Sequence, residues 1–318
     1  MARKPKGRAI DGIFLLDKPA GMSSNKALQQ IKHLYGAAKA GHTGALDPLA
    51  TGLLPICLGE ATKFSQYLLD SDKAYLTTAR LGEKTDTADA DGVVIETRPV
   101  PSLLDKDQLE TLLKTHFSGQ IDQVPPIYSA LKVQGQPLYK LARKGIEVEV
   151  KSRQVTIHSI RLLAIREQEL DLEVFCSKGT YIRSIVQDLG ELLGCGAHVS
   201  RLRRTHVGGY NAAQMLDFDQ LHANIQALPE STSECIQNYL DGLLLPPWSA
   251  IESLPLCELT EEQSIALRQG KRLANLGLAT DAVWRVFAEP NGQFLGLAET
   301  DANGCLKGKR LIRTDTSE

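Results

Sequence analysis

Residues 41–54 read GHTGALDPLATGLL, and this stretch decides the fold around it. Its three glycines and one proline fit neither the apolar repeat of an amphipathic helix nor the alternation of a strand. The glycines permit positive φ and close backbone approach, while Pro48 biases Asp47 toward an extended conformation. The stretch therefore predicts a catalytic loop that presents His42 and Asp47. Taken alone, an aspartate before a proline is also a common turn former.

Apolar segments on both sides of this loop predict strands that anchor it, at residues 10–16 and 53–58. Before the loop, Ser23 or Ser24 can cap a helix that ends at Gly36. After the second strand, the apolar residues at 64, 67 and 68 suggest another helix. Residues 73–81 then alternate as a strand, whose inward face is expected to carry Tyr75, Thr77, Ala79 and Leu81.

The middle of the chain adds further strands and one helix. Residues 155–165 and 170–177 predict adjacent strands, and residues 180–193 become helical before Gly194 ends the helix. Strands that come in runs, with few helices between them, favour an α+β fold over a doubly wound parallel sheet.

Residues 124–153 have the composition of an inserted, basic surface lobe, with one short helix expected at 138–143. The basic residues of the segment outnumber its two glutamates, Glu147 and Glu149. These basic residues are Lys132, Lys140, Arg143, Lys144, Lys151 and Arg153. Two more basic clusters comprise Arg201, Arg203, Arg204 and His206, and then Arg268, Lys271, Arg272, Lys307, Lys309, Arg310 and Arg313. Each cluster alone is typical of a solvated face, but together they favour an RNA-binding surface on a chain of net charge −2.

The C-terminal part predicts a separate small domain, with the boundary near residues 243–248. Residues 260–263, TEEQ, form a capping box that opens a helix to about Gln269. Strands at 283–288 and 294–299 flank an Asn291-Gly292 turn, and the chain turns again at Asn303-Gly304. Short strands with one helix suit a small β-barrel.

Composition excludes several classes of protein. No apolar run reaches the roughly 18 residues that span a bilayer, and the basic N-terminus precedes too short an apolar run for a signal peptide. A cytoplasmic protein is expected. The six cysteines are scattered, and Cys195 with His198 lacks a second pair at zinc-site spacing, so we expect buried thiols. Residues 85–92, TDTADADG, fail the EF-hand pattern and predict a turn rich in carboxylates.

Four segments resemble motifs of the TruB family of tRNA pseudouridine synthases, in the family's order. Residues 16–24 (LDKPAGMSS) are similar to its first motif and residues 41–52 to its second. Residues 178–185 (KGTYIRSI) resemble its arginine-bearing strand, and residues 194–204 its later leucine motif. The motif positions show no departure from the bacterial tRNA-modifying branch.

The resemblance implies a fold and a division into domains. Residues 1–248 are expected to form a pseudouridine-synthase catalytic domain, with a mixed, largely antiparallel central sheet, flanking helices and the basic insert at about 124–153. Residues 249–318 are expected to form a PUA-like β-barrel that binds RNA.

The implied reaction converts uridine to pseudouridine at position 55, in the T-arm of tRNA. The target base must leave its stack, and a nucleophile must engage the nucleotide in a dry pocket. The resemblance implies that Asp47 is this nucleophile, attacking either C1′ of the sugar or C6 of the uracil. Arg183 would orient the carboxylate and keep it ionised.

The resemblance implies roles for five further residues. Tyr75 stacks on the target base and helps remove a sugar proton. Tyr181 is expected to share a strand face with Arg183 and so to face the same pocket, and Leu202 supplies an apolar wall. His42 enters the RNA where the flipped base had been. Lys18 is expected to be structural or to face a phosphate.

The implied reaction needs no cofactor and no metal, and the implied partner is tRNA. We expect a monomer with no membrane, guide RNA or obligate protein partner. One alternative is an RNA-binding module or tRNA-folding chaperone, which would have no need of the Asp47–Arg183 pair. Another is the guide-dependent branch of the superfamily, which the absence of long Lys-rich tails disfavours.

Overall fold

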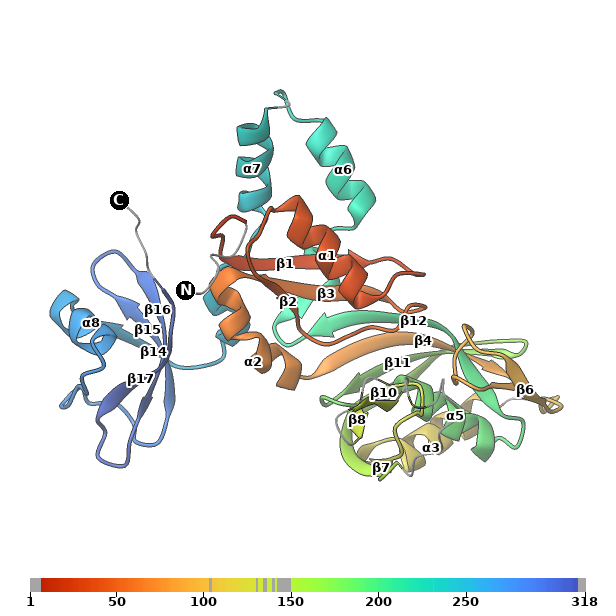
Figure 1. Cartoon of the computed structure of the whole chain (residues 1–318). Helices are drawn as coiled ribbons and strands as arrows, with labels where there is room; N and C mark the ends of the chain where they lie inside the picture. Colours follow the sequence, from red (N-terminus) through yellow and green to blue (C-terminus); the bar gives the residue numbers. More distant parts are fainter. Residues whose placement is uncertain are drawn as a thin grey trace.

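The computed structural model describes residues 7–102, 105–129, 131–133, 136–138, 141, 150–230 and 232–313. These ranges form a larger part around a long sheet and a smaller C-terminal part with its own sheet (Figure 1). Within the described ranges, no helix combines the length and the apolar character that crossing a membrane requires.

A nine-stranded sheet organises the larger part. Its main path is β1 (Gly12–Lys18), β3 (Thr51–Leu58), β12 (Ala197–Val207), β4 (Lys73–Leu81), β11 (Glu169–Cys176), β10 (Arg153–Arg166) and β7 (Gly119–Gln123). Off this path, β2 (Ala40–His42) pairs with β3, and β13 (Tyr210–Asn211) pairs with β12. Among the described strands of this sheet, only β3 and β12 pair in parallel. The predicted mixed, largely antiparallel sheet is confirmed.

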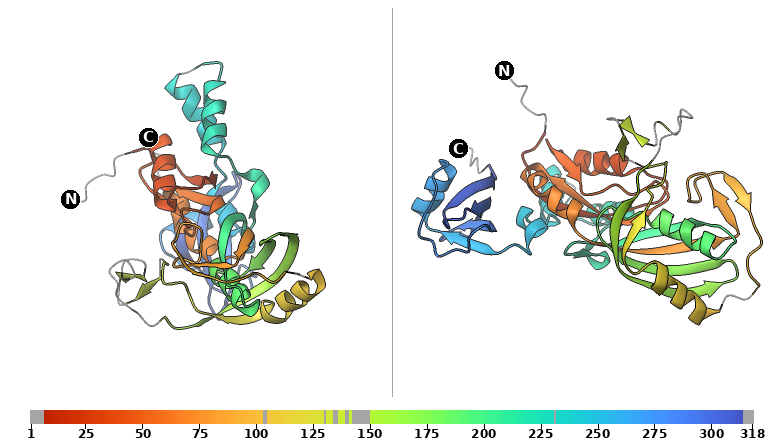
Figure 2. Two further views of the ribbon diagram at one scale, coloured as in Figure 1. Left: turned by 90° about the vertical axis from the view of Figure 1, so that its right-hand side faces the viewer. Right: turned by 90° about the horizontal axis from the view of Figure 1, so that it is seen from below.

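Helices bury one face of this sheet. The main core cluster joins apolar side chains of the sheet to those of α1 (Ser24–Leu34), α3 (Lys106–His116) and α5 (Ile182–Leu192). As predicted, the Ser23 side chain caps α1, and Gly36 takes a positive φ of 58° just after it. Two further helices, α6 (Phe218–Gln226) and α7 (Ser233–Gly242), form a hairpin that projects beyond β1 (Figures 1 and 2).

The second face of β1 and β3 meets the C-terminal part. The second predicted helix is split into η1 (Gly59–Lys63) and α2 (Ser65–Asp70), which lie here with η3 (Pro247–Ile251). An apolar cluster joins Phe64 and Ile251 from these segments to Phe294 and Leu297 of the C-terminal part. The division of the chain at residue 248 stays a prediction, and apolar packing connects the two sides of that boundary.

The C-terminal sheet has the strand order β14 (Leu256–Leu259), β15 (Val283–Ala288), β16 (Gln293–Thr300) and β17 (Leu306–Leu311). Both predicted turns join antiparallel strands, and Thr260 caps α8 (Glu261–Arg268) with the predicted capping box. Because β14 and β17 are the two edges of this four-stranded sheet, its described strands do not confirm a closed, PUA-like barrel.

Two short hairpins complete the described structure. One joins β5 (Glu83–Thr85) to β6 (Val94–Thr97), and the other joins β8 (Lys132–Val133) to β9 (Gln136–Pro137). Most of the predicted basic insert, including all but two residues of the helix expected at 138–143, lies outside the described residues.

Within the described structure, the second and third basic clusters are largely engaged. Arg203 pairs with Asp17 at 2.6 Å, and the Arg204 side chain is buried rather than exposed to solvent. In the C-terminal sheet, Lys307 and Lys309 both contact Glu299, at 3.1 and 2.9 Å. In the described structure, these side chains therefore serve contacts within the protein rather than a free cationic surface.

The irregular stretch is shorter than the sequence predicts. Gly41 and His42 belong to β2, and β3 begins at Thr51, so the loop proper is residues 43–50, here named the active-site loop. Gly52 makes the early start of β3 possible, because it has φ 98° and lies against Arg204 of the parallel strand β12. A Cβ atom at this position would lie 2.2 Å from the Arg204 carbonyl oxygen.

We expect Gly52→Ala to lower the free energy of unfolding by about 3 kcal/mol or more, because it combines a strained φ with a backbone clash. Gly194→Ala is the matched control, since Gly194 has φ 75° but no neighbouring atom within 4 Å of the added methyl group. Strain alone should cost that variant about 1–2 kcal/mol. Urea unfolding measures both, and equal losses would refute the proposed clash.

Candidate active site

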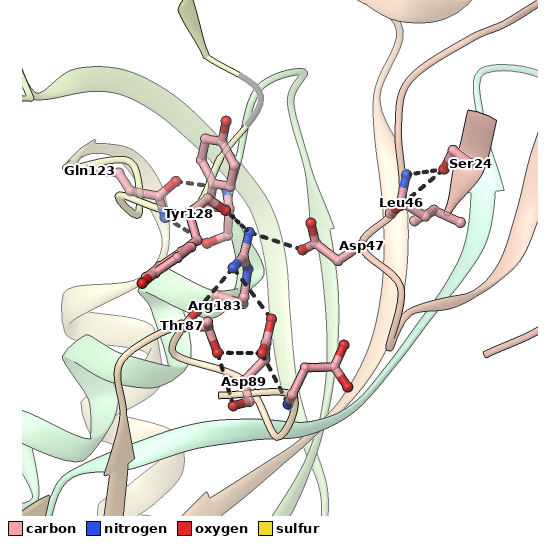
Figure 3. A network of polar contacts seen from close by, with 10 residues as sticks. Ser24, Leu46, Asp47, Thr87, Asp89, Gln123, Tyr128 and Arg183 are labelled. Atoms are coloured by element: carbon pink, nitrogen blue, oxygen red, sulfur yellow. Dashed lines mark hydrogen bonds and ion pairs between the residues drawn. The ribbon is translucent and has the colours of Figure 1, made fainter. Parts of the chain in front are cut away.

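Side chains of α1 and β12 form hydrogen bonds with the backbone of the active-site loop. The Ser24 hydroxyl accepts a hydrogen bond from the Leu46 N–H at 2.7 Å and donates to the Leu46 carbonyl at 3.0 Å. Arg204 donates to the Gly44 carbonyl at 3.2 Å. These contacts fix the backbone just before Asp47, whose carboxylate projects from the loop toward α5 (Figure 3).

Lys18 fixes the other side of Asp47. Its ammonium group donates to the carbonyls of Pro19 and Met22 at 2.8 and 2.7 Å, and reaches that of Pro48 at 3.4 Å. The side chain is fully buried, and burial lowers the pKa of Lys18 to about 8. Of the two predicted roles for Lys18, the contacts therefore favour the structural one, and the phosphate-facing alternative has no support from them.

Arg183 connects the loop to two other segments of the chain. Its guanidinium pairs with Asp47 at 3.0 Å and with Asp89 at 3.3 Å. It also donates to the carbonyls of Thr87 and Tyr128, each at 2.9 Å (Figure 3). The predicted pairing of Asp47 with Arg183 is present, and four acceptors hold the guanidinium in one orientation.

Asp89 is a site residue that sequence reasoning missed. It lies in the turn at 85–92, which the sequence predicts to be rich in carboxylates without assigning it a role at the site. Its carboxylate is buried, accepts a hydrogen bond from the Thr87 hydroxyl at 2.6 Å and pairs with Arg183. The run of carboxylates in the sequence predicts the turn. It does not identify Arg183 as the partner of Asp89, because Arg183 lies on a helix far along the chain.

The arginine-bearing segment is helical where a strand was predicted. The strand β11 ends at Cys176, Gly179 turns the chain with φ 78°, and Tyr181 caps α5. The prediction that Tyr181 and Arg183 share a strand face is therefore wrong. Both still line one cavity, because Tyr181 stands at the first turn of the helix that carries Arg183.

Two polar contacts fix Tyr181 at the start of α5. The Tyr181 N–H donates to the Gln123 side-chain oxygen at 2.7 Å, and the Gln123 amide donates back to the Tyr181 carbonyl at 2.9 Å. The Arg153 guanidinium lies 4.7 Å from the centre of the Tyr181 ring, which is a cation–π distance. Arg153 thus places a positive charge against the Tyr181 ring, and both residues line the same cavity.

The cavity beside Asp47 has a volume of about 550 Å³. Five predicted site residues line it: Asp47, Tyr75, Tyr181, Arg183 and Leu202. Arg204 and Ser129 are also part of the lining. This volume lies within the range of small-molecule sites, about 300–1,000 Å³. A larger cavity of about 1080 Å³ lies between α2, η3 and the C-terminal sheet, but none of these five residues lines it.

The electrostatics of the cavity centre on Asp47. The side chain is recessed with 39% of its surface exposed. Burial raises the pKa of Asp47, the Arg183 charge lowers it, and the neighbouring carboxylates of Asp89 and Asp91 raise it again. The Lys18 charge lowers it as well, but the net pKa is raised, so the two cations only partly offset the effects of burial and of the neighbouring carboxylates.

His42 lies apart from this network. It belongs to β2, is partly buried, and does not line the cavity. Burial and the Arg204 charge lower the pKa of its imidazole, and Nδ1 has no hydrogen-bond partner among the residues that the structure describes. The described contacts therefore do not pair His42 with Asp47.

Metal ligation has no counterpart among the described residues, where no group of three His, Cys, Asp or Glu side chains could hold an ion. The isolated Cys195-x-x-His198 pair is structural: Cys195 is a buried thiol, and the His198 ring bonds the Glu83 carbonyl at 2.9 Å.

Family models match three consecutive segments of the chain. The TruB family pseudouridylate synthase N-terminal domain matches residues 32–182. The tRNA pseudouridylate synthase B C-terminal domain matches residues 183–252, and the pseudouridine synthase II TruB C-terminal domain matches residues 255–312.

Curated relatives align over nearly the whole chain. The tRNA pseudouridine synthase B of Vibrio cholerae serotype O1 (strain M66-2) is 51% identical over 312 residues, which are 98% of this chain and 99% of the relative. The protein of the same name from Shewanella sp. (strain W3-18-1) is 52% identical over 313 residues, covering 98% and 97%.

Solved structures share the fold. One chain in the crystal structure of a Cbf5-Nop10-Gar1 complex matches with a TM-score of 0.68 at 26% identity, covering 92% of this chain and 79% of that one. Another, in the structure of an H/ACA RNP bound to a substrate RNA containing 2′-deoxyuridine, matches with a TM-score of 0.70 at 22% identity, covering 99% and 92%. With relatives half identical to it from end to end, the chain belongs to the TruB family of pseudouridylate synthases, the enzymes that isomerise uridine to pseudouridine.

Proposed function

We propose that the chain modifies tRNA at the T-arm uridine, position 55, with Asp47 as the nucleophile. The observation that carries this proposal is the 3.0 Å ion pair between Asp47 and Arg183 at the wall of a nucleoside-sized cavity. A carboxylate is a weak nucleophile in water because it is well solvated. Recessing it beside one permanently charged, rigid guanidinium keeps it ionised and fixes its direction of attack.

The cavity suits a base that has left its stack. Tyr75 on β4 offers an aromatic face, and Leu202 on β12 offers an apolar wall, and both are buried. Stacking on an aromatic ring contributes about 1–3 kcal/mol per base, which offsets much of the unstacking cost of a few kcal/mol. Tyr181 closes the side nearest Arg183. In this arrangement Asp47 attacks C1′ of the sugar or C6 of the uracil, and Tyr75 takes up the sugar proton.

His42 has a separate role in this proposal, as the side chain that enters the RNA where the target base had been. Its lowered pKa supports this role, because a neutral imidazole stacks on bases without needing a counter-charge. His42 ends β2 next to the active-site loop and does not line the cavity, which supports a role outside the pocket that takes the target base.

The proposed substrate is free tRNA. The names of the curated relatives, tRNA pseudouridine synthase B, support tRNA as the substrate class. We further propose that the chain acts as a monomer without a guide RNA or protein partner. A role as a tRNA-folding chaperone, like a cytoplasmic location, stays a prediction.

We expect Asp47→Asn to bind unmodified tRNA with unchanged affinity and to lose turnover by at least about 1,000-fold, because the amide cannot attack. Carbodiimide labelling of pseudouridine, on tRNA transcript without added cofactor or second RNA, measures the product and its position. Asp107→Asn, an exposed carboxylate in the first turn of α3, is the control.

Full product from Asp47→Asn would refute the nucleophile assignment. Product at a position outside the T-arm would refute the site specificity but leave Asp47 in place. Rescue of tRNA function by the inactive variant would support the chaperone role.

We expect the turnover of the native protein to fall as the pH drops through the raised pKa of Asp47, since only the carboxylate attacks. The acid limb of the rate profile should therefore lie above the ordinary pKa of aspartate. Asp89→Asn removes a negative charge, so it should move this limb to lower pH. It should also lower the plateau by about 10- to 100-fold, because Arg183 loses one of its two carboxylate partners.

Asp91→Asn is the matched control for this experiment. Asp91 also raises the pKa of Asp47, but no ion pair joins it to Arg183 in the described structure. The variant should move the acid limb in the same direction and keep the plateau. If Asp89→Asn behaves in the same way as Asp91→Asn, Asp89 does not position Arg183.

A further inference from the structure

Arg204 on β12 is a buried cation that the proposed reaction has not yet used. Its side chain is 1% exposed, and it lines the same cavity as Asp47. Arg183 has two carboxylate partners and Arg203 has Asp17. For Arg204, the described structure contains no carboxylate within ion-pair distance, and the one titratable partner that favours its charged form is Tyr75.

Two backbone carbonyls hold the Arg204 guanidinium. Its Nε donates to the Leu53 carbonyl at 2.8 Å, and Nη2 donates to the Gly44 carbonyl at 3.2 Å. The Tyr75 side chain lines the same cavity as this guanidinium, whose charge acts on the phenol. In the sheet, Arg204 is the register partner of Tyr75 across β12 and β4. One planar group therefore connects β3 with the active-site loop beside the proposed stacking residue.

The hydrogen bonds to two backbone carbonyls offset only part of the cost of a charge at this position. A buried, unpaired cation costs several kcal/mol, and apolar residues of similar volume often replace buried charges without loss. The two buried lysines near the loop, Lys18 and Lys73, have carbonyl partners and pKa values lowered to about 8. An arginine cannot give up its proton in this way. A permanent charge in this place is therefore better explained by what it faces.

We propose that Arg204 is a positioning residue that fixes the Tyr75 phenol and stabilises negative charge on its oxygen. The inference rests on the proposed function, in which Tyr75 takes up a proton from the sugar. The ionised Tyr75 oxygen takes up that proton and becomes a neutral phenol, the electron pair of the broken C–H bond stays on the sugar, and Arg204 keeps all of its own protons. Because the same guanidinium binds the Gly44 carbonyl, it also fixes the distance between Tyr75 and the loop that carries Asp47.

The electrostatic environment of Tyr75 agrees with this assignment. Burial raises the pKa of the phenol, and the Arg204 charge lowers it. Cys176 on β11 and Asp47 on the active-site loop both raise it. The other charged groups that line the cavity are Lys73, Arg153, Lys178 and Arg183. Arg204, the cross-strand neighbour of Tyr75, is thus the charged group that opposes the effect of burial on the phenol.

The test compares Arg204→Met with Arg203→Met in single-turnover reactions on saturating unmodified tRNA transcript, across pH. Arg203 is the adjacent arginine on β12, but it pairs with Asp17 and does not line the cavity. We expect Arg204→Met to keep its tRNA affinity within about threefold and to lower the rate near neutral pH at least about tenfold. Its alkaline-rising limb should move to higher pH by about one unit or more, a tenfold change in the phenol equilibrium.

The acid limb provides an internal reference. Asp47 sets that limb, and Arg204 is not among the charges that shift the pKa of Asp47. It should stay in place in Arg204→Met, and Arg203→Met should leave the whole profile unchanged. Arg204→Gln is the second variant, since it keeps amide donors for the loop carbonyls while removing the charge. It should show the same shift of the alkaline limb even if the methionine variant does not fold.

Each remaining result has one meaning. Weaker tRNA binding with an unmoved alkaline limb would overturn the inference, because Arg204 would then act on the RNA or on the loop alone. A rate loss in Arg204→Gln without a pH shift would overturn it too. Tyr75→Phe separates the two levels: full activity of that variant refutes the proposed role of the Tyr75 hydroxyl, whereas an inactive Tyr75→Phe beside an active Arg204→Met refutes only the inference about Arg204.

Discussion

The ion pairs of Arg183 with Asp47 and Asp89 set the geometry on which the active site depends. The guanidinium stands on α5, Asp47 on the active-site loop, and Asp89 on the segment that joins β5 to β6. These three segments are far apart in the chain, and no regular hydrogen-bonding pattern aligns them with one another. A planar cation with a fixed fork of donors can join them at defined angles, which a flexible ammonium group would not do.

A second constraint is the way in which the fold keeps an irregular loop rigid. The active-site loop has few hydrogen bonds of its own, so buried donors from the sheet and from α1 satisfy its carbonyls. The cost of burying Lys18 and Arg204 is thus balanced in part by acceptors that would otherwise lack partners. The site thus has two kinds of polar contact. Arg183 binds the carboxylates of Asp47 and Asp89, whereas Lys18 and Arg204 bind backbone carbonyls of the loop that carries Asp47.

Much of the fold could be predicted from the sequence because its signals are local. The alternation in residues 73–81, the Ser23 cap of α1 and the capping box at 260–263 all appear as expected. Errors arose where tertiary contacts override local pattern. The strand β3 extends back to Thr51 because β12 pairs with it, and Tyr181 begins a helix because Gly179 turns the chain after β11.

The same distinction applies to the site. Family resemblance brought together the residues that line the cavity, but Asp89 and Arg204 carry no local sign of their roles. A carboxylate-rich turn and a run of arginines each have several common explanations, and the burial that separates Arg204 from Arg203 depends on which face of β12 each residue occupies.

The clamps on the active-site loop have one more consequence. Ser24, Lys18 and Arg204 all bind main-chain atoms of the loop, at Leu46, Pro48 and Gly44. The path of the backbone is therefore largely insulated from the side chains that the loop displays. Ala45, which is exposed, and Leu49, which is half-buried, can change without releasing any of these contacts. Selection can thus alter the surface that the loop offers to a substrate while the position of Asp47 is preserved.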